Sequence, residues 1–400
     1  MNKFVAVLQE YSLPLLAGVV TAVAWANLDH ASYEAVAHHI HFAVNDVFMV
    51  FFFAIAAGEI VESCLPGGAL NPPSKAINPL VATVGGVVGP AAVFLAWSYV
   101  TGDAAIRGGW GIPTATDIAL AWLVARAVFG KGHPAVSFLL LLAIADDAIG
   151  LVIIAVFYPD PAHPVQPVYL ALVAAAMVGA YGLRRAGFRS FWAYLAGPGV
   201  VSWLGLKFAG VHPALALVFV VPFMPTAGHD EGVFADSEEQ MHDTLNRFQH
   251  AFRLPVDLGL FAFGLANAGV VFAAVGNATW AVLAGLAVGK TGGIWLASTA
   301  AHAVGFRRPE GLSAATIGLV GLVGALGLTV ALFVAGVAYT DPAITAAAKM
   351  GALLSIGVAP VAVAIGWLRR RAVAGAPAAS AAATSAHARG SVPVPVVDAG

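Results

Sequence analysis

Charge is scarce in this sequence. Only 10% of its 400 residues are Asp, Glu, Lys or Arg, and 60% are hydrophobic. Soluble domains carry roughly 25% charged residues, and the mean hydropathy here is +0.86. Water is therefore not the main solvent of the chain. The composition excludes collagen, coiled coil and an intrinsically disordered protein, and it leaves a membrane protein with several spans.

The sequence also lacks a basic excess and has almost no cysteine. Its formal net charge is -2, whereas binding to phosphates needs clustered Lys and Arg, so we expect no nucleic-acid partner. The single cysteine, Cys64, cannot form an internal disulfide and does not indicate a redox compartment.

Long apolar runs are what the sequence has in abundance. A helix needs about 20 mostly apolar residues to cross a bilayer, and such runs predict an all-α membrane protein with about twelve transmembrane helices. The predicted spans are 12–28, 42–64, 77–100, 110–129, 134–158, 167–186, 190–209, 212–227, 254–275, 279–304, 313–339 and 344–368. Residues 1–371 would form the transmembrane domain, and the Ala/Pro/Ser-rich residues 372–400 a disordered cytoplasmic tail.

The distribution of Lys and Arg predicts the orientation of these spans. Loops on the cytoplasmic side are enriched in both residues. With both termini in the cytoplasm, fifteen of the nineteen basic residues fall on that side. Only Arg107, Lys207 and Lys349 fall outside, and Lys290 lies within a span.

Four charged residues lie deep within predicted spans: Asp117, Asp146, Asp147 and Lys290. A charge at the centre of a bilayer costs several kcal/mol, so each is a candidate functional residue. The low charge content of the rest of the chain makes these four stand out.

The adjacent pair Asp146 and Asp147 is the sharpest signal. Neighbouring residues on a helix diverge by about 100°, so the two carboxyl groups must reach a polar cavity in different directions. Burial and mutual repulsion favour a proton on at least one of them near neutral pH. A carboxylate that titrates there can hold either a proton or a hard cation, and competition for one site couples their movements. The alternative is a pair satisfied by helix contacts, without a role in transport.

Lys290 needs a partner carboxylate or local water at such a depth. It could be a structural ion-pair partner or a second proton carrier that is released when sodium arrives. The alternative is a lysine whose side chain extends to the membrane interface.

Two spans are predicted to break in the middle. In GIPTATDIA (111–119), Pro113 removes a backbone donor and disfavours helix at the preceding residue. In GLVGALGLT (321–329), glycines recur every three residues, although this spacing alone can also mark close helix packing. Interrupted spans in both halves of a chain indicate a transporter site at the midplane. Facing helix N-termini would suit Asp117, and facing C-termini would suit Lys290.

Several long segments, in order along nearly the whole chain, resemble the NhaA family of sodium/proton antiporters. They are NDVFMVFFFAIAAGEI (45–60), GIPTATDIALA (111–121), AIADDAIGLVIIAVFY (143–158), GVHPALA (210–216), LFAFGLANAGV (260–270), GLAVGKTGGI (285–294) and GLTVALFVA (327–335). Similarity to this family implies inverted repeats with two interrupted helices, the fourth and the eleventh.

The resemblance also implies roles for individual residues. Asp147 would be the principal sodium ligand, and Asp146 would pair with Lys290. The unwound stretches would be supported by the side chains or backbone of Thr116, Asp117, Gly324 and Gly327.

The implied activity is transport. Two protons would be exchanged for one Na+ or Li+ by alternating access, electrogenically, in the bacterial inner membrane, for pH homeostasis. We expect no enzyme activity, no cofactor and no metal other than the transported Na+. The choice among Na+, Li+ and K+ stays open.

Other residues have two possible interpretations. Asp46, Glu59 and Glu62 could line a cytoplasmic cation funnel or pair locally, and His212 could respond to pH or simply mark a membrane edge. His38, His39 and His41 could bind a metal but are better explained by an exposed polar loop.

The sequence also departs from the family pattern. Thr291 and Gly292 replace a Pro-Leu pair, and Asn246 replaces a glutamate tied to pH sensing, so pH regulation could differ. The connection from Leu28 to His41 is too short for the β-hairpin of family dimers, and a homodimer formed by that route is in doubt.

An intramembrane aspartyl protease is the rival function. That chemistry needs two aspartates facing each other so that they share a proton. Adjacent residues on one helix do not face each other, and no G-x-G-D motif is present. The protease is therefore disfavoured.

Overall fold

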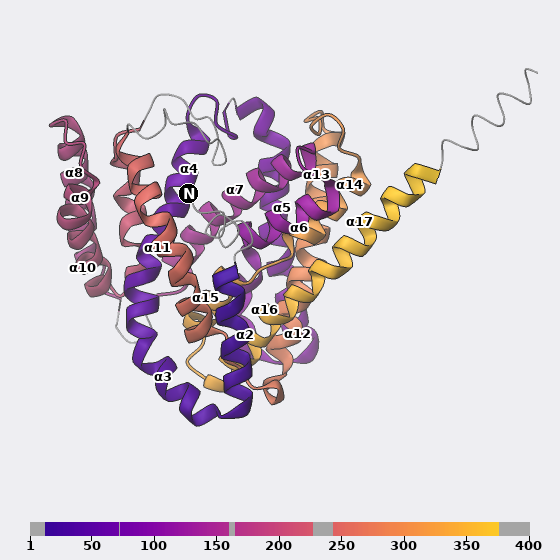
Figure 1. Cartoon of the computed structure of the whole chain (residues 1–400), viewed down its shortest axis with the longest axis horizontal. Coiled ribbons are helices and arrows are strands. Elements are labelled where there is room, and N and C mark those ends of the chain that lie inside the picture. Colours follow the sequence, from indigo (N-terminus) through magenta and orange to yellow (C-terminus); the bar gives the residue numbers. More distant parts are fainter. Residues whose placement is uncertain (1–12, 72, 160–164, 227–242, 376–400) are drawn as a thin grey trace, which may run out of the picture.

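The computed structural model describes residues 13–71, 73–159, 165–226 and 243–375. Within these ranges the chain is helical and contains no strand (Figure 1). The α-helices are α2 (Leu13–Leu28), α3 (His30–Phe42), α4 (Met49–Cys64), α5 (Pro73–Thr101), α6 (Ile118–Phe129), α7 (Pro134–Phe157), α8 (Leu170–Arg185), α9 (Phe191–Tyr194), α10 (Val200–Ala209), α11 (Thr244–Asn267), α12 (Asn277–Ala284), α13 (Thr291–Ala303), α14 (Ala314–Gly324), α15 (Thr329–Ala338), α16 (Pro342–Leu354) and α17 (Val358–Gly375).

Shorter helical turns join several of these helices. The π-helical turns are η1 (Ala43–Phe48), η4 (Leu195–Gly199) and η9 (Gly285–Lys290). The 3-10 helices are η2 (Ala104–Thr114), η3 (Pro167–Tyr169), η5 (Pro213–Phe219), η6 (Val221–Phe223), η8 (Phe272–Ala274) and η10 (Ser355–Gly357).

The helices support a membrane protein but not yet the predicted number of spans. Among the described residues, six helices are long and apolar enough to cross a membrane, or up to eight if each of two bent pairs is one span. Twelve spans therefore stay a prediction.

Both bent pairs lie where the sequence predicts a break. η2 and α6 meet at 60°, and α14 and α15 meet at 56°. Pro113, which has no backbone donor, is the next-to-last residue of η2, and Ala115 and Asp117 have extended backbone before α6 begins. In the second pair, residues 325–328 separate the two helices.

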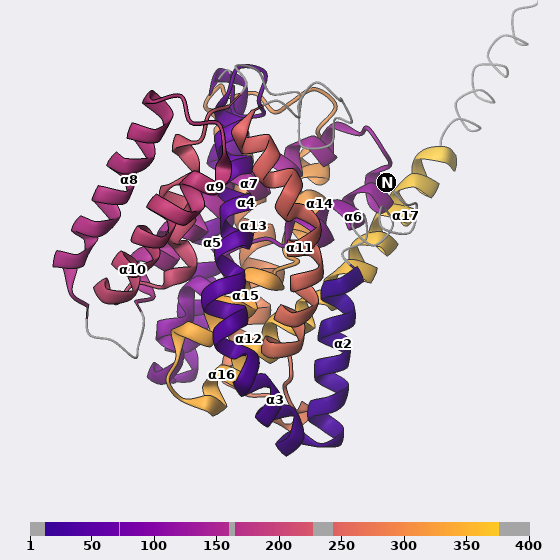
Figure 2. The same cartoon turned by 60° about the vertical axis from the view of Figure 1, so that its left-hand side comes forward.

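Helix α7 lies at the centre of the fold. It is apolar on all sides, which is typical of a helix buried within a bundle, and 67% of its most apolar window is buried, against 17% for α8. Helices α8 to α10 form one flank, and α13, α14 and α17 lie on the opposite side of α7 (Figures 1 and 2). Asp146 and Asp147 on α7 are therefore surrounded by helices.

Close packing of glycines brings α13 against α5. A Cβ atom at Gly85 or Gly89 would collide with the backbone carbonyl of Gly293 or Gly289, respectively. Only residues without a side chain permit this approach. It fixes the helix that follows Lys290 against the core of the bundle.

Several predicted boundaries are wrong. The connection after Leu28 is not a loop but helix α3, which continues through η1 into α4, so His38, His39 and His41 lie on a helix. Asp29 begins α3 by accepting a hydrogen bond from the backbone N–H of Ser32 at 3.2 Å. This local cap outweighs the polar composition of the segment.

Three other segments differ from the expected spans. The described part of the region predicted as 212–227 contains two short 3-10 helices, η5 and η6, and α11 occupies Thr244–Asn267 rather than 254–275. Helix α17 continues to Gly375, beyond the predicted domain boundary at Arg371. The remaining tail, 376–400, lies outside the described residues.

Candidate functional site

A buried ion pair forms the centre of the site. The side chains of Asp146 and Lys290 are fully buried, and Asp146 Oδ2 lies 2.9 Å from Lys290 Nζ. Lys290 is the last residue of the π-helical turn η9, and such turns occur frequently at functional sites. Lys290 is therefore paired inside the protein and does not extend to the membrane interface.

The carbonyl ends of the two bent pairs meet this ion pair. Lys290 Nζ donates a hydrogen bond to the carbonyl oxygen of Thr114, the last residue of η2, at 2.6 Å. The hydroxyl of Thr116 lies 2.9 Å from Asp146 Oδ2 and 3.0 Å from the carbonyl oxygen of Gly324, the last residue of α14. The partial negative charge of these helix ends favours a cation, and here the cation is Lys290.

The hydrogen bonds of the Thr116 hydroxyl depend on whether Asp146 carries a proton. A hydroxyl has one proton and can donate to only one acceptor at a time. With Asp146 ionised, Thr116 must choose between the carboxylate and the Gly324 carbonyl. With Asp146 protonated, the carboxyl group can donate to Thr116 while Thr116 donates to Gly324. Both arrangements fit these distances.

Asp117 joins the amino-terminal ends of α6 and α15, the second helices of the two bent pairs. Its Oδ1 accepts from the backbone N–H of Leu120 in α6 at 3.1 Å, and its Oδ2 accepts from that of Thr329 at the start of α15 at 3.3 Å. Its own N–H donates to the carbonyl of Leu326 at 2.7 Å. One carboxylate thus caps two helix N-termini, where negative charge is stabilising.

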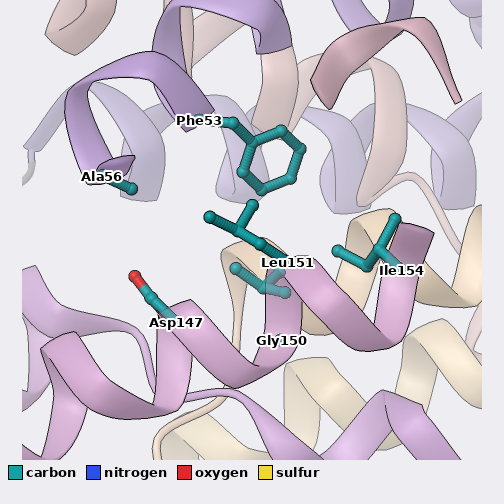
Figure 3. Close-up of a pocket in the computed structure, with 7 residues that line it drawn as sticks. Phe53, Ala56, Asp147, Gly150, Leu151 and Ile154 are labelled. Atoms are coloured by element: carbon teal, nitrogen blue, oxygen red, sulfur yellow. The ribbon is translucent and has the colours of Figure 1, made fainter. Parts of the chain in front are cut away.

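Asp147 has a different environment from its neighbour. Its Oδ1 is buried and has no hydrogen-bond partner among the described residues. The side chain faces a cavity of about 10 Å³, at the lower limit of a cavity that can hold one water. Phe53, Leu151 and Ile154 line the other wall of this cavity (Figure 3). The cavity is therefore apolar except at the carboxyl group.

The electrostatic surroundings of Asp147 are mostly negative. Asp146, Glu59 and Asp117 act on it as like charges, and only Lys290 opposes them. Because Asp146 and Lys290 compensate each other, an ionised Asp147 leaves the site with an excess negative charge. A proton or a monovalent cation in the cavity would neutralise that charge.

The acids of the second predicted span do not all gather at one place. Asp46 lies in η1, thirteen residues before Glu59, which corresponds to about 20 Å along a helix. Glu59 lies near Arg253 and Asp147. Glu62 accepts a hydrogen bond from Gln249 at 3.2 Å. Only Glu59 and Glu62 share one end of α4, so Asp46 does not belong with them.

His212 does not line this cavity but packs against a neighbour of Phe53. Its Nδ1 accepts from the backbone N–H of Ala214 at 3.3 Å, which caps η5. Its ring packs edge-on against Phe333 at 4.8 Å, and Phe333 packs against Phe53 at 5.2 Å. His212 is thus connected to the Asp147 cavity through two aromatic rings.

Sequence reasoning missed some of these contacts. The Thr114 carbonyl cannot be identified as a partner of Lys290 from residue type, because every residue has a carbonyl. Asn246 donates to Asp243 from both its backbone and its side chain, at 2.7 and 2.9 Å, in the cap of α11. Asn45 and Asn267 form a reciprocal pair, at 3.2 and 2.9 Å, that joins η1 to the end of α11. The sequence signal that could have indicated this pair is that both residues are asparagines, whose amide groups can donate to and accept from each other.

Comparison with known proteins identifies relatives over about nine-tenths of the chain. The family described as Na+/H+ antiporter 1 matches residues 2–368. A Geobacter metallireducens protein named Na(+)/H(+) antiporter NhaA is 58% identical over 373 residues, which cover 92% of this chain and 98% of the relative. The protein of the same name from Geobacter sulfurreducens is 56% identical, with the same coverage. One from Desulfitobacterium hafniense is 54% identical and covers 91% of this chain and 96% of the relative.

Proposed function

The chain belongs to the Na+/H+ antiporter 1 family, and on that premise we propose that it exchanges Na+ or Li+ for H+ across the bacterial inner membrane. Its relatives are named as antiporters, which are transporters and not enzymes. Asp147 and Asp146 are the proposed cation and proton ligands, with Lys290 as the charge partner.

One observation carries this proposal: of the two adjacent aspartates, one has a charged partner and the other has a carboxylate oxygen without a partner. Asp146 is compensated by Lys290 at 2.9 Å, whereas an oxygen of Asp147 is buried beside a small cavity without a hydrogen-bond partner. A buried carboxylate oxygen without a partner is costly. Either a proton or Na+ removes that cost, and the small cavity gives no room for both, so the two ions would compete.

The ion pair supplies a second proton. Na+ held by Asp147 would also draw on the negative charge of Asp146, which weakens the hold of Asp146 on the Lys290 ammonium. Lys290 would then release a proton in addition to the one displaced from Asp147. Two protons would move against one Na+, so each cycle would carry net charge and respond to the membrane potential.

The broken helices supply the moving parts of alternating access. Thr116 and Asp117 lie in the stretch between η2 and α6, and Gly324 and Gly327 lie at the break between α14 and α15. Half-helix ends at the midplane are typical of transporter sites. A shift of the Asp146–Thr116–Gly324 contacts on ion exchange would move these ends relative to α7.

The proposed orientation assigns the two sides of the cavity. With both termini in the cytoplasm, Glu59 and Glu62 lie on the cytoplasmic side of Asp147. Phe53, Leu151 and Ile154 then close the outward side with apolar atoms. Na+ would approach past Glu59 and leave only after this apolar wall opens.

The aspartyl protease alternative gains no support. A catalytic dyad needs two carboxyl groups that share a proton. Here Asp146 contacts Lys290, and Asp147 faces a different, largely apolar cavity.

Everted membrane vesicles test the proposal. In vesicles from cells without other sodium/proton antiporters, Na+ added after acidification of the lumen should dissipate the pH gradient. Asp147→Asn should abolish the response, and Glu59→Gln, which keeps the site intact, should retain part of it. Full activity of Asp147→Asn would refute the assignment of this residue, and no response to Na+ or Li+ in the parent protein would refute antiport itself.

A further inference from the structure

A second cavity lies on the side of the molecule that carries α17 and shares no lining residue with the Asp147 cavity. This groove has a volume of about 480 Å³, within the roughly 300–1,000 Å³ of small-ligand sites. It runs between α13, α14 and α17, and α14 packs against both of the other helices. These helices lie together at one edge of the molecule in Figure 1. Its walls include Trp295, Gly318, Leu319, Leu322, Ile365 and Arg369.

The groove exists because small residues occupy its floor. A Cβ atom at Gly292 would meet no other atom within 4 Å, and one at Gly318 would only reach ordinary contact with Trp295. Gly292 stands where a leucine is expected from the family pattern. A larger side chain at this position has room to start into the groove and would narrow it.

The lining is apolar except at its two ends. At one end Thr291 lies beside Lys290. At the other end Arg369 donates to the carbonyl oxygen of Ala315, the second residue of α14, at 3.1 Å. Leu322 and Ala315 are seven residues apart, so the groove extends about 10 Å along α14. That length is about two-thirds of the roughly 15 Å half-thickness of a hydrocarbon core, so the groove fits within the depth of one leaflet.

A second arginine stands beyond the same end. Thr299 lies two helical turns after Thr291 and one after Trp295, so all three share one face of α13. Arg308 donates from Nη2 to the Thr299 hydroxyl at 3.1 Å. Its Nε is buried and has no hydrogen-bond partner in the described part of the chain. The contact with Thr299 uses one donor of the guanidinium, so the two terminal nitrogens of Arg308 have further donors to offer.

We propose that this groove binds an anionic glycerophospholipid of the leaflet on the side where α17 ends, with an acyl chain along α14 and the phosphate between Arg369 and Arg308. An apolar trough with charge at one end matches a molecule that is apolar along its chain and anionic at its head. Each guanidinium has five donors in a planar fork that suits phosphate oxygens. Arg369 uses one of these donors for Ala315, which leaves the others for the phosphate.

Such a lipid would pack directly against a broken helix. Helix α14 ends at Gly324, whose carbonyl faces Thr116 in the site. The lipid would therefore contact one of the elements proposed to move, without touching Asp146 or Asp147.

Native mass spectrometry of the full-length protein in mild detergent tests the proposal. The delipidated protein is titrated with phosphatidylglycerol and, separately, with phosphatidylcholine of the same acyl chains. The parent protein should bind one phosphatidylglycerol more tightly than phosphatidylcholine. Gly292→Leu, which narrows the groove, and Arg369→Ala, which removes the charge, should each weaken phosphatidylglycerol binding by about tenfold or more.

Matched variants control for general effects. Gly182→Leu places the same side chain on α8, where a Cβ atom also meets nothing within 4 Å, and should bind as the parent does. Ile365→Trp fills the groove from α17 and replaces Gly292→Leu if that variant does not fold.

Three results would overturn the proposal. One is equal phosphatidylglycerol binding by the parent and the filled variants. The second is equal binding of both lipids with no effect of Arg369→Ala. The third is a filled variant that changes the oligomeric mass but not the lipid bound, which would identify a second copy of the chain as the occupant.

Discussion

Lys290 Nζ lies 2.9 Å from Asp146 Oδ2, with both side chains fully buried. The same nitrogen donates to the carbonyl of Thr114 at 2.6 Å, so the lysine joins α7 to the end of η2. Two opposite charges at this distance compensate each other, whereas either one alone would be buried and unpaired. The pair therefore has a structural role as well as its proposed role in proton transfer.

Breaking this pair on one side should be more costly than removing it. Lys290→Met and Asp146→Asn should each destabilise the protein by about 3–5 kcal/mol, because each leaves a partner without compensation. The double variant should lose much less than the sum of the two. Thermal unfolding in one detergent measures the stability of the parent, the two single variants and the double variant, which together form a double-mutant cycle. Additive losses would show that the two side chains do not interact.

Asp147 should matter for Na+ binding far more than for folding. Its Oδ1 makes no hydrogen bond within the described structure, so Asp147→Asn removes no observed contact. Saturating Na+, at about 100 times its Kd, should stabilise the parent protein by about 2.7 kcal/mol. The same Na+ should leave Asp147→Asn unchanged, while choline chloride should affect neither protein. An equal sodium-dependent shift in the variant would assign the ion to another residue.

Because Asp117 caps two helices, its variants should lose stability in proportion to the number of caps that they remove. A lost N-cap costs about 0.5–2 kcal/mol, and this carboxylate caps both α6 and α15. Asp117→Ala should therefore lose about twice as much stability as Asp117→Asn, whose amide retains one accepting oxygen. The midpoint of thermal unfolding provides the comparison. Equal losses in the two variants would mean that only one of the helices depends on this cap.

The two glycines at the second break should respond differently to an added methyl group. At Gly327 a Cβ atom would lie 2.8 Å from Leu286 Cδ2 and 3.0 Å from the Ala115 carbonyl, whereas at Gly324 the nearest atoms lie at 3.6 Å. Gly327→Ala should cost about 1–3 kcal/mol. Gly324→Ala should be neutral or gain up to about 1 kcal/mol. Thermal stability of the two variants in parallel tests this, and the reverse order would contradict the packing at the break.

Charge scarcity made part of the site predictable. Because so few charged residues occur in the apolar runs, Asp117, Asp146, Asp147 and Lys290 could be selected from sequence alone, and the structure places all four around one region. Pro113 likewise predicted where η2 ends. These inferences used residue type and position within a run, which do not depend on the tertiary fold.

Contacts made by the backbone could not be predicted in the same way. The Thr114 carbonyl and the N–H of Thr329 have no signature in the sequence, and their roles arise only when η2, α6 and α15 meet. Helix α3 was missed because its polar composition resembles a loop, while its cap at Asp29 and its continuation into α4 are what make it helical. The number of spans depends on how short and bent helices sit in a bilayer, and twelve stays a prediction.

Sodium binding measured as a function of pH tests the central claim most directly. The purified protein is titrated with Na+ by calorimetry in buffers between about pH 6 and about pH 9, with proton release recorded from the buffer dependence of the heat. If Na+ and H+ compete at Asp147, the apparent Kd should rise by about tenfold for each unit of falling pH and for each proton displaced, and up to two protons should be released per Na+. A Kd that stays constant across this range, with no proton released, would contradict the account.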